Sequence, residues 1–179
     1  MAAVPGTHDF ADSQAPSTEM NTFVRDPINF LLTPPIAVLR QTVAQTITTG
    51  TMTAATFDTE DLDTNVSATS QHDNVTNNTR FTAVYAGWYQ VSGGTGYSAN
   101  VTNRRANRWA VNGASLSGTG VYLPTTPTGT CETPSRTFFL FLNVGDYVEF
   151  QIYQDSGGNL NTAVSTDQQT TMMVRWVSR

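Results

Sequence analysis

Four acidic residues lie close together in the chain, and carboxylates at such spacing are typical of sites for hard cations. They are Asp58, Glu60, Asp61 and Asp63. Carboxylate oxygens are the ligands that Ca²⁺ prefers in proteins. The spacing is not that of an EF-hand loop, so a solvated acidic turn is the favoured interpretation and a calcium site the weaker one. Asp155, within the turn sequence DSGGN, is a similar but weaker candidate.

Catalysis would need a positioned nucleophile, base or metal ligand. The chain has two histidines, His8 and His72, and a single cysteine, Cys131. It contains no H-x-x-x-H or G-x-S-x-G sequence, and neither histidine lies near Cys131 in the chain. We therefore expect no enzyme activity and no cofactor. The alternative is a cell-wall hydrolase in which folding joins Cys131 to His72, or acidic residues to one another.

The charge pattern excludes several classes of partner. Only 13% of the residues are charged, the net charge is −5, and all nine basic residues are arginines. Binding to a phosphate backbone needs a basic patch, and Arg104, Arg105 and Arg108, which we expect in a loop, are the sole candidate. No apolar run approaches the roughly 18 residues of a membrane span. We expect no signal peptide, and hence synthesis in a cytoplasm.

The elements that position these residues begin with an N-terminal arm, residues 1–35. Residues 18–32 have the pattern of a helix, and Asp26 before Pro27 predicts that a second helical turn starts there. The arm is too apolar for free exposure, so it must pack on the domain or on a partner. The residues that we expect to make this attachment are Phe23, Ile28, Phe30, Leu31 and Leu32.

Residues 36–179 read as all-β. The alternation in 147–153 predicts a half-buried strand with Val148, Phe150 and Ile152 inward, and 171–177 predicts the closing strand. Residues 81–92 are apolar on both faces, so we expect one strand lying between two layers or at a subunit contact. Asn112-Gly113 predicts a hairpin, and the glycine-rich residues 93–96 predict a turn. Short strands at this spacing indicate an antiparallel sandwich or jelly roll.

Further residue assignments follow from composition. We expect loops at 58–79 and 123–134, and short strands at 42–48 and 51–57. Most of the large aromatic residues are expected in the core; they are Trp88, Trp109, Phe138, Phe139, Phe141, Phe150 and Trp176. The tyrosines at 85, 89, 147 and 153 fit the core, a subunit contact or a carbohydrate platform.

Several motifs occur in an order that resembles the C1q-like jelly-roll family of the TNF/C1q superfamily. They are Phe57-Asp58 before a polar loop, RFTA at 80–83, AGWY at 86–89, RWAVNG at 108–113, LFLNVGDYVEFQI at 140–152 and TMMVRWV at 171–177. The resemblance covers 36–179. It implies an antiparallel jelly roll that forms homotrimers and works as a binding or shell module. Some members bind calcium in loops near the trimer axis.

The arm sequence at 21–32, NTFVRDPINFLL, resembles the leader found before C1q-like domains in structural proteins of phages of actinobacteria. The lack of lysine agrees with a GC-rich host. The resemblance implies a virion protein, specifically a trimeric capsid decoration attached by its arm to the major capsid protein or another virion protein. The alternative is a minor tail protein or adhesin that binds host cell-surface glycan.

Overall fold

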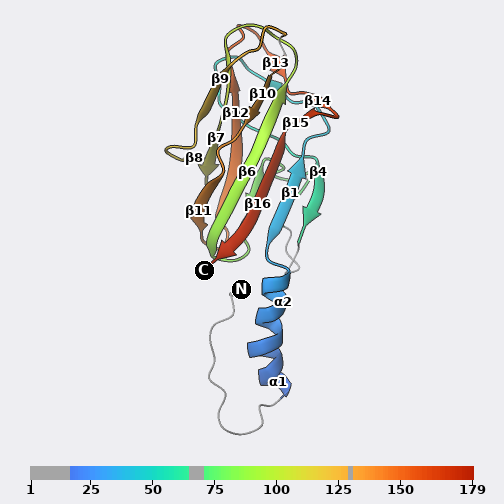
Figure 1. The fold of residues 1–179 in the computed structure, drawn as a ribbon, viewed down its shortest axis with the longest axis vertical. Helices are drawn as coiled ribbons and strands as arrows, with labels where there is room; N and C mark the ends of the chain where they lie inside the picture. Colours follow the sequence, from blue (N-terminus) through green and yellow to red (C-terminus); the bar gives the residue numbers. More distant parts are fainter. Residues whose placement is uncertain (1–16, 65–70, 129–130) are drawn as a thin grey trace.

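The chain forms a β-sandwich from which a helical arm projects at one end (Figure 1). The computed structural model describes residues 17–64, 71–128 and 131–179. The arm consists of α1 (Ser17–Met20), the π-helical η1 (Asn21–Arg25) and α2 (Asp26–Leu32). The strands are β1 (Ile36–Arg40), β2 (Thr46–Ile47), β3 (Thr53–Ala54), β4 (Thr59–Asp63), β5 (Arg80–Thr82), β6 (Gly87–Tyr97), β7 (Arg104–Val111), β8 (Ala114–Ser115), β9 (Val121–Pro124), β10 (Cys131–Pro134), β11 (Phe138–Leu142), β12 (Tyr147–Gln154), β13 (Leu160–Asn161), β14 (Val164–Ser165), β15 (Gln168–Gln169) and β16 (Thr171–Ser178).

The helical arm is continuous from Ser17 to Leu32. The predicted second helical turn does begin at Asp26, as α2, but Asp26 is not its N-cap, because the chain is already helical before it. Asp26 has helical angles, and its backbone N–H donates to the carbonyl of Asn21, five residues earlier. Pro27 has no N–H to donate, and its ring would crowd the carbonyl four residues back. The wider π-helical turn accommodates the proline without ending the helix. Among the described residues, no helix is long and apolar enough to span a bilayer.

Two antiparallel sheets form the layers of the sandwich. In the first sheet, β6 pairs with β10 and β11 on one side and with β16 on the other, followed by β1 and β4. In the second sheet, β12 pairs with β7, β3 and β5, and β7 also pairs with β8 and β9. Neighbours such as β1 and β16 come from opposite ends of the domain, as a jelly roll requires. The predicted all-β jelly-roll fold is confirmed.

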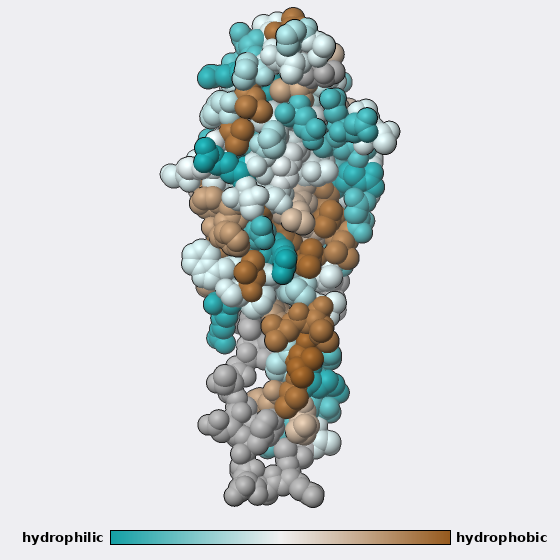
Figure 2. Space-filling view, in the orientation of Figure 1, coloured by the Kyte–Doolittle hydropathy of each residue, from teal (hydrophilic) through white to brown (hydrophobic). Residues whose placement is uncertain are grey.

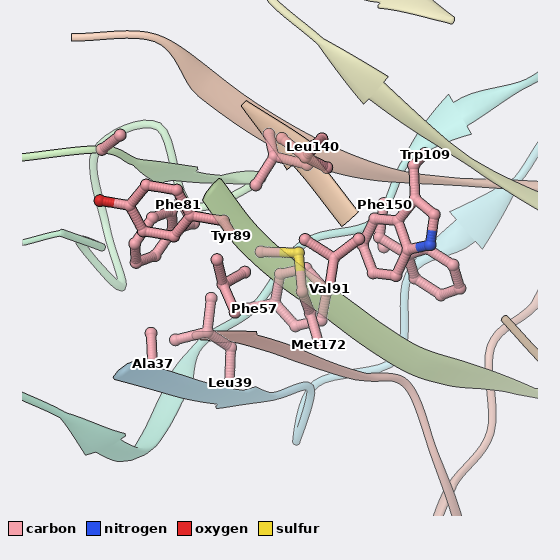
Figure 3. Close-up of a cluster of buried hydrophobic side chains, with 14 of the residues drawn as sticks. Ala37, Leu39, Phe57, Phe81, Tyr89, Val91, Trp109, Leu140, Phe150 and Met172 are labelled. Atoms are coloured by element: carbon pink, nitrogen blue, oxygen red, sulfur yellow. The ribbon is translucent and has the colours of Figure 1, made fainter. Parts of the chain in front are cut away.

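The apolar core lies between these sheets. Val148, Phe150 and Ile152 are fully buried, as the alternation in β12 predicts. The rings of Trp109 and Phe150 lie 4.7 Å apart between their centroids. Figure 3 shows this pair beside the side chains of Val91 and Met172 from the first sheet.

Residues 81–92 are not one strand. The chain leaves the second sheet after β5 and enters the first sheet at Gly87, where β6 begins. Both faces are apolar because the segment crosses between layers. The predicted turn at 93–96 is also wrong, because these glycines lie inside β6. A Cβ at Gly93 would clash with the carbonyl oxygen of Thr171, so glycine permits the close approach of β16.

Other boundaries differ from those predicted. The hairpin at Asn112-Gly113 is confirmed, with φ of 50° and 80°. The three arginines expected in a loop lie on β7 instead. Parts of the predicted loops pair as β4, β9 and β10, and the short strands expected at 42–48 and 51–57 shrink to β2 and β3. Polar composition does not prevent pairing where a neighbouring strand offers free backbone groups.

Candidate functional site

The potential catalytic groups are separated in the fold. His72 is 3% exposed, and its ring nitrogens lie 2.8 Å from the carbonyl oxygen of Arg80 and 3.2 Å from that of Phe57. Cys131 is buried in β10 opposite Tyr97, with its Sγ 3.8 Å from the Thr133 hydroxyl. The histidine ring therefore faces backbone carbonyls and not the thiol. His8 lies outside the described residues.

The predicted calcium ligands bind other partners. Asp58 accepts hydrogen bonds from the backbone N–H groups of Thr42 at 2.8 Å and Val43 at 2.7 Å. Partial burial raises the pKa of Asp58, but these bonds and those from the Thr42 and Thr59 hydroxyls outweigh it, so the pKa is lowered overall. A carboxylate engaged in this way organises a loop.

The remaining acidic residues lie on β4 and have different partners. Asp61 forms an ion pair with Arg40 at 2.7 Å, and the hydrogen bond from Arg40 lowers the pKa of Asp61. Asp63 accepts a hydrogen bond from Gln71 at 2.7 Å. Burial, and then the charge of Asp63, raise the pKa of Glu60. Across the described ranges, no three His, Cys, Asp or Glu side chains are placed to share a metal ion.

The apolar residues of the arm divide into two groups. Ile28, Leu31 and Leu32 are 50%, 68% and 74% exposed, and Phe23 is half-buried. Phe30 is only 6% exposed, because its ring packs edge-on against Tyr85 and Trp176 at 4.9 and 4.8 Å. The assignment of Phe30 to an attachment surface is therefore wrong, since Phe30 joins the arm to its own domain.

A second apolar surface covers the side of the first sheet that faces away from the core. We define this outer face by the outward residues of β1, β4, β6, β11 and β16: Ile36, Val38, Leu62, Trp88, Gln90, Phe139, Phe141, Met173, Arg175 and Val177. Trp88, Phe139 and Phe141 are 45%, 53% and 47% exposed, so the prediction that they belong to the core is wrong. The rings of Trp88 and Phe141 lie 5.9 Å apart, edge to face.

The outer face and the helical arm present their apolar residues on the same side of the molecule. Figure 2 shows hydrophobic side chains over the lower part of the first sheet and along α2 in one view. Exposed apolar side chains that gather on one face in this way mark an interaction site in soluble proteins. In the sequence, the segment that indicates this surface is FFLFL at 138–142, because a strand with this sequence is apolar on both faces.

The arginines of β7 have different environments. Arg105 is fully buried, and its guanidinium donates to the carbonyls of Asn100, Thr102 and Arg104. Arg104 is exposed and pairs with Asp155. One of the three arginines is thus inaccessible, and another is neutralised by a carboxylate. They do not form a basic patch.

Comparison with known proteins identifies the fold. No family model matches the chain, and no curated protein matches its sequence. The structure is similar to the globular domain of zebrafish complement 1qA protein, with a TM-score of 0.56 and 15% identity over 81% of this chain and 98% of that one. It is similar to Eiger TNF from S. frugiperda, with a TM-score of 0.52 and 11% identity over 81% of this chain and 94% of that one.

The PRD1 vertex protein P5 is also similar, with a TM-score of 0.51 and 15% identity over 80% of this chain and 97% of that one. These likenesses show that the chain has the C1q/TNF-like jelly-roll fold. They confirm the resemblance seen in the sequence motifs at the level of the fold.

Proposed function

We propose that the protein is a structural, non-enzymatic component of a viral particle, where it forms a homotrimer that decorates the capsid surface. The observation that carries this proposal is the exposed apolar outer face, aligned with the exposed apolar residues of α2. The C1q/TNF-like fold and the similarity to a protein described as a vertex protein support it. So does the resemblance of the arm to phage leader sequences.

Self-association would use the outer face. Burying Trp88, Phe139 and Phe141 against a second copy stabilises the assembly by about 25 cal/mol per Å² of apolar area removed from water. Gln90 and Arg175 lie between the apolar residues on paired strands. Such polar positions give an interface specificity, because each must find a partner across it.

Attachment to the particle would use the arm. Ile28, Leu31 and Leu32 are exposed on a helix that Phe30 fixes to the domain, so their positions are set before binding. In a trimer three such helices would bind at once, which raises the effective affinity well above that of one arm. The partner in this proposal is the major capsid protein or another virion protein.

The attachment is tested with a triple variant, I28Q/L31Q/L32Q, mixed with purified particles that lack the protein. Substitution is preferable to deletion of residues 1–35, because deletion also removes Phe30 from its site in the domain. The matched control is V43Q/V101Q/V164Q, which changes three exposed valines away from the arm.

The proposal predicts that the control sediments with the particles and that I28Q/L31Q/L32Q stays in solution as a folded trimer. If the triple variant sediments as well as the control does, the arm is not the attachment element. If it becomes monomeric, the exposed residues of α2 form subunit contacts, and attachment requires another surface.

The second candidate is a minor tail protein or adhesin that binds host cell-surface glycan. It is favoured by Tyr122, which is exposed and lies beside the Arg104–Asp155 ion pair at the edge of the second sheet. Trimers that ignore particles but bind host envelope would support this candidate over capsid decoration.

A further inference from the structure

A cleft of about 580 Å³ opens at the edge of the second sheet, where β7 and β9 pair. Its lining residues are Asn103, Arg104, Tyr122, Leu123, Pro124 and Asp155. This volume lies in the range of about 300–1,000 Å³ that is usual for small-molecule sites. Because the cleft belongs to the second sheet, an assembly built on the outer face of the first sheet leaves it accessible.

The cleft lies far from the helical arm. Phe30 packs on Trp176 near Gly87, where β6 starts, whereas Tyr97 at the other end of β6 donates hydrogen bonds to the carbonyls of Ala106 and Tyr153. Arg104 and Asp155 are two residues beyond those carbonyls, and β9 lies in the half of the sandwich remote from α2 (Figure 1). A ligand in the cleft would therefore be presented away from the attached end.

Tyr122 supplies an aromatic surface that self-association does not explain. Its side chain is 55% exposed. Among the described residues, the other aromatic side chains with similar exposure are Trp88, Phe139 and Phe141, and all three lie on the outer face. The guanidinium of Arg104 lies 5.4 Å from the centroid of the Tyr122 ring and 5.9 Å from that of Tyr153. The contact with Arg104 favours this position of the Tyr122 ring before any ligand arrives.

The polar groups of the cleft are also fixed. Asp155 accepts hydrogen bonds from the backbone N–H of Arg104 at 2.8 Å and from its Nε at 3.0 Å. Asn103 donates from its Nδ2 to the carbonyl of Asp155 at 2.8 Å and has a φ of 56°, a conformation that asparagine tolerates better than most residues. Hydrogen bonds to Tyr153 and then Asp155 raise the pKa of Arg104, which remains charged.

We propose that this cleft binds a neutral saccharide through stacking on Tyr122 and hydrogen bonds to Asn103, Arg104 and Asp155. The apolar C–H face of a sugar ring fits an aromatic ring, and adjacent hydroxyls fit the planar amide, carboxylate and guanidinium groups. The charges of Arg104 and Asp155 cancel within the cleft, which leaves no net attraction for an anion. This proposal rests on the second candidate function and names its binding site and the class of its ligand.

Saturation-transfer NMR and calorimetry on the full chain test the site. The probes are methyl glucoside, methyl galactoside, methyl mannoside and N-acetylglucosamine, with glucuronate and inorganic phosphate as anionic comparisons. We expect at least one neutral sugar to bind, with about a tenfold loss of affinity in Y122A and no more than about a twofold change in Y122F, which retains the ring. The loop variant N103A should also weaken binding.

The contradicting results are specific. Absence of binding by all four neutral sugars overturns the proposal, and stronger binding of glucuronate or phosphate overturns the selectivity for a neutral ligand. Unchanged affinity in both Y122A and N103A would show that the sugar binds elsewhere. None of these results bears on attachment through the arm, which is measured separately with particles.

Discussion

At the scale of single residues, Asp58 shows how an acidic residue that resembles a metal ligand instead organises a loop. Its two carboxylate oxygens accept hydrogen bonds from the backbone of Thr42 and Val43, directly after β1. The Thr42 hydroxyl adds a bond of 2.7 Å. These bonds favour the ionised form, so the pKa of Asp58 is lowered below its ordinary value of 3.8.

We expect D58N to lower the free energy of unfolding by about 1 kcal/mol at pH 7, after allowance for solvent screening. The amide replaces an acceptor oxygen with an NH₂ group that faces backbone donors. A lowered folded-state pKa gives stability that is present above the unfolded value and lost as pH falls through the folded value. The difference between D58N and the wild type should therefore shrink below pH 3.8, which is measured by urea unfolding at several pH values.

The matched control is D61N. Asp61 pairs with Arg40 on the surface, where such ion pairs contribute about 0–1 kcal/mol. A loss in D58N that persists undiminished at pH 3, or a D58N protein as stable as the wild type, would contradict the assigned role.

Residue assignments from the sequence succeeded where burial follows the strand period. Val148, Phe150 and Ile152 alternate with polar neighbours, and all three are buried as predicted. Phe139 and Phe141 alternate equally well with Leu140 and Leu142, yet face outward. Hydrophobicity alone cannot distinguish a residue of the core from an apolar residue on the surface, so the outward position of Phe139 and Phe141 is visible only in the fold.

At the scale of elements, the side chain of Phe30 packs the helical arm against the domain. Phe30 contacts Tyr85, which follows β5, and Trp176 in β16. The sequence correctly predicted a helix here, because its apolar residues recur at helical spacing. It could not show which apolar residue faces the domain, since that depends on where β16 ends.

We expect F30A to lower the free energy of unfolding by about 3–5 kcal/mol, the usual cost of removing a buried phenylalanine ring. The comparison is L32A, which truncates a side chain that is 74% exposed and should change stability by no more than about 0.5 kcal/mol. Chemical denaturation measures both. Equal effects of the two variants would show that Phe30 does not connect the arm to the sandwich.

The strand boundaries that were missed have a common cause. The crossing between sheets at 83–86 is apolar on both faces, so periodicity joined β5 and β6 into one strand. The glycines inside β6 resemble a turn in the sequence. The close approach of β16 at Thr171, which requires a glycine at position 93, is visible only in the fold. In each case a contact distant in sequence decided the local structure.

At the scale of the whole molecule, the fold separates three surfaces. The outer face of the first sheet is apolar, the arm extends from one end, and the cleft at Tyr122 lies in the second sheet. The proposed self-association, attachment and ligand binding would therefore use different surfaces. The motif order in the sequence predicted the jelly roll, and the comparisons with C1q and TNF domains confirm it.

The most direct test of the account is the mass of the protein in solution, measured by light scattering for the wild type, W88Q/F141Q and the control V43Q/V144Q. The variants change pairs of exposed apolar residues on and off the outer face. We predict three times the mass of one chain for the wild type and the control, and the mass of a single folded chain for W88Q/F141Q. A monomeric wild type, or a W88Q/F141Q protein that remains trimeric, would contradict self-association through the outer face.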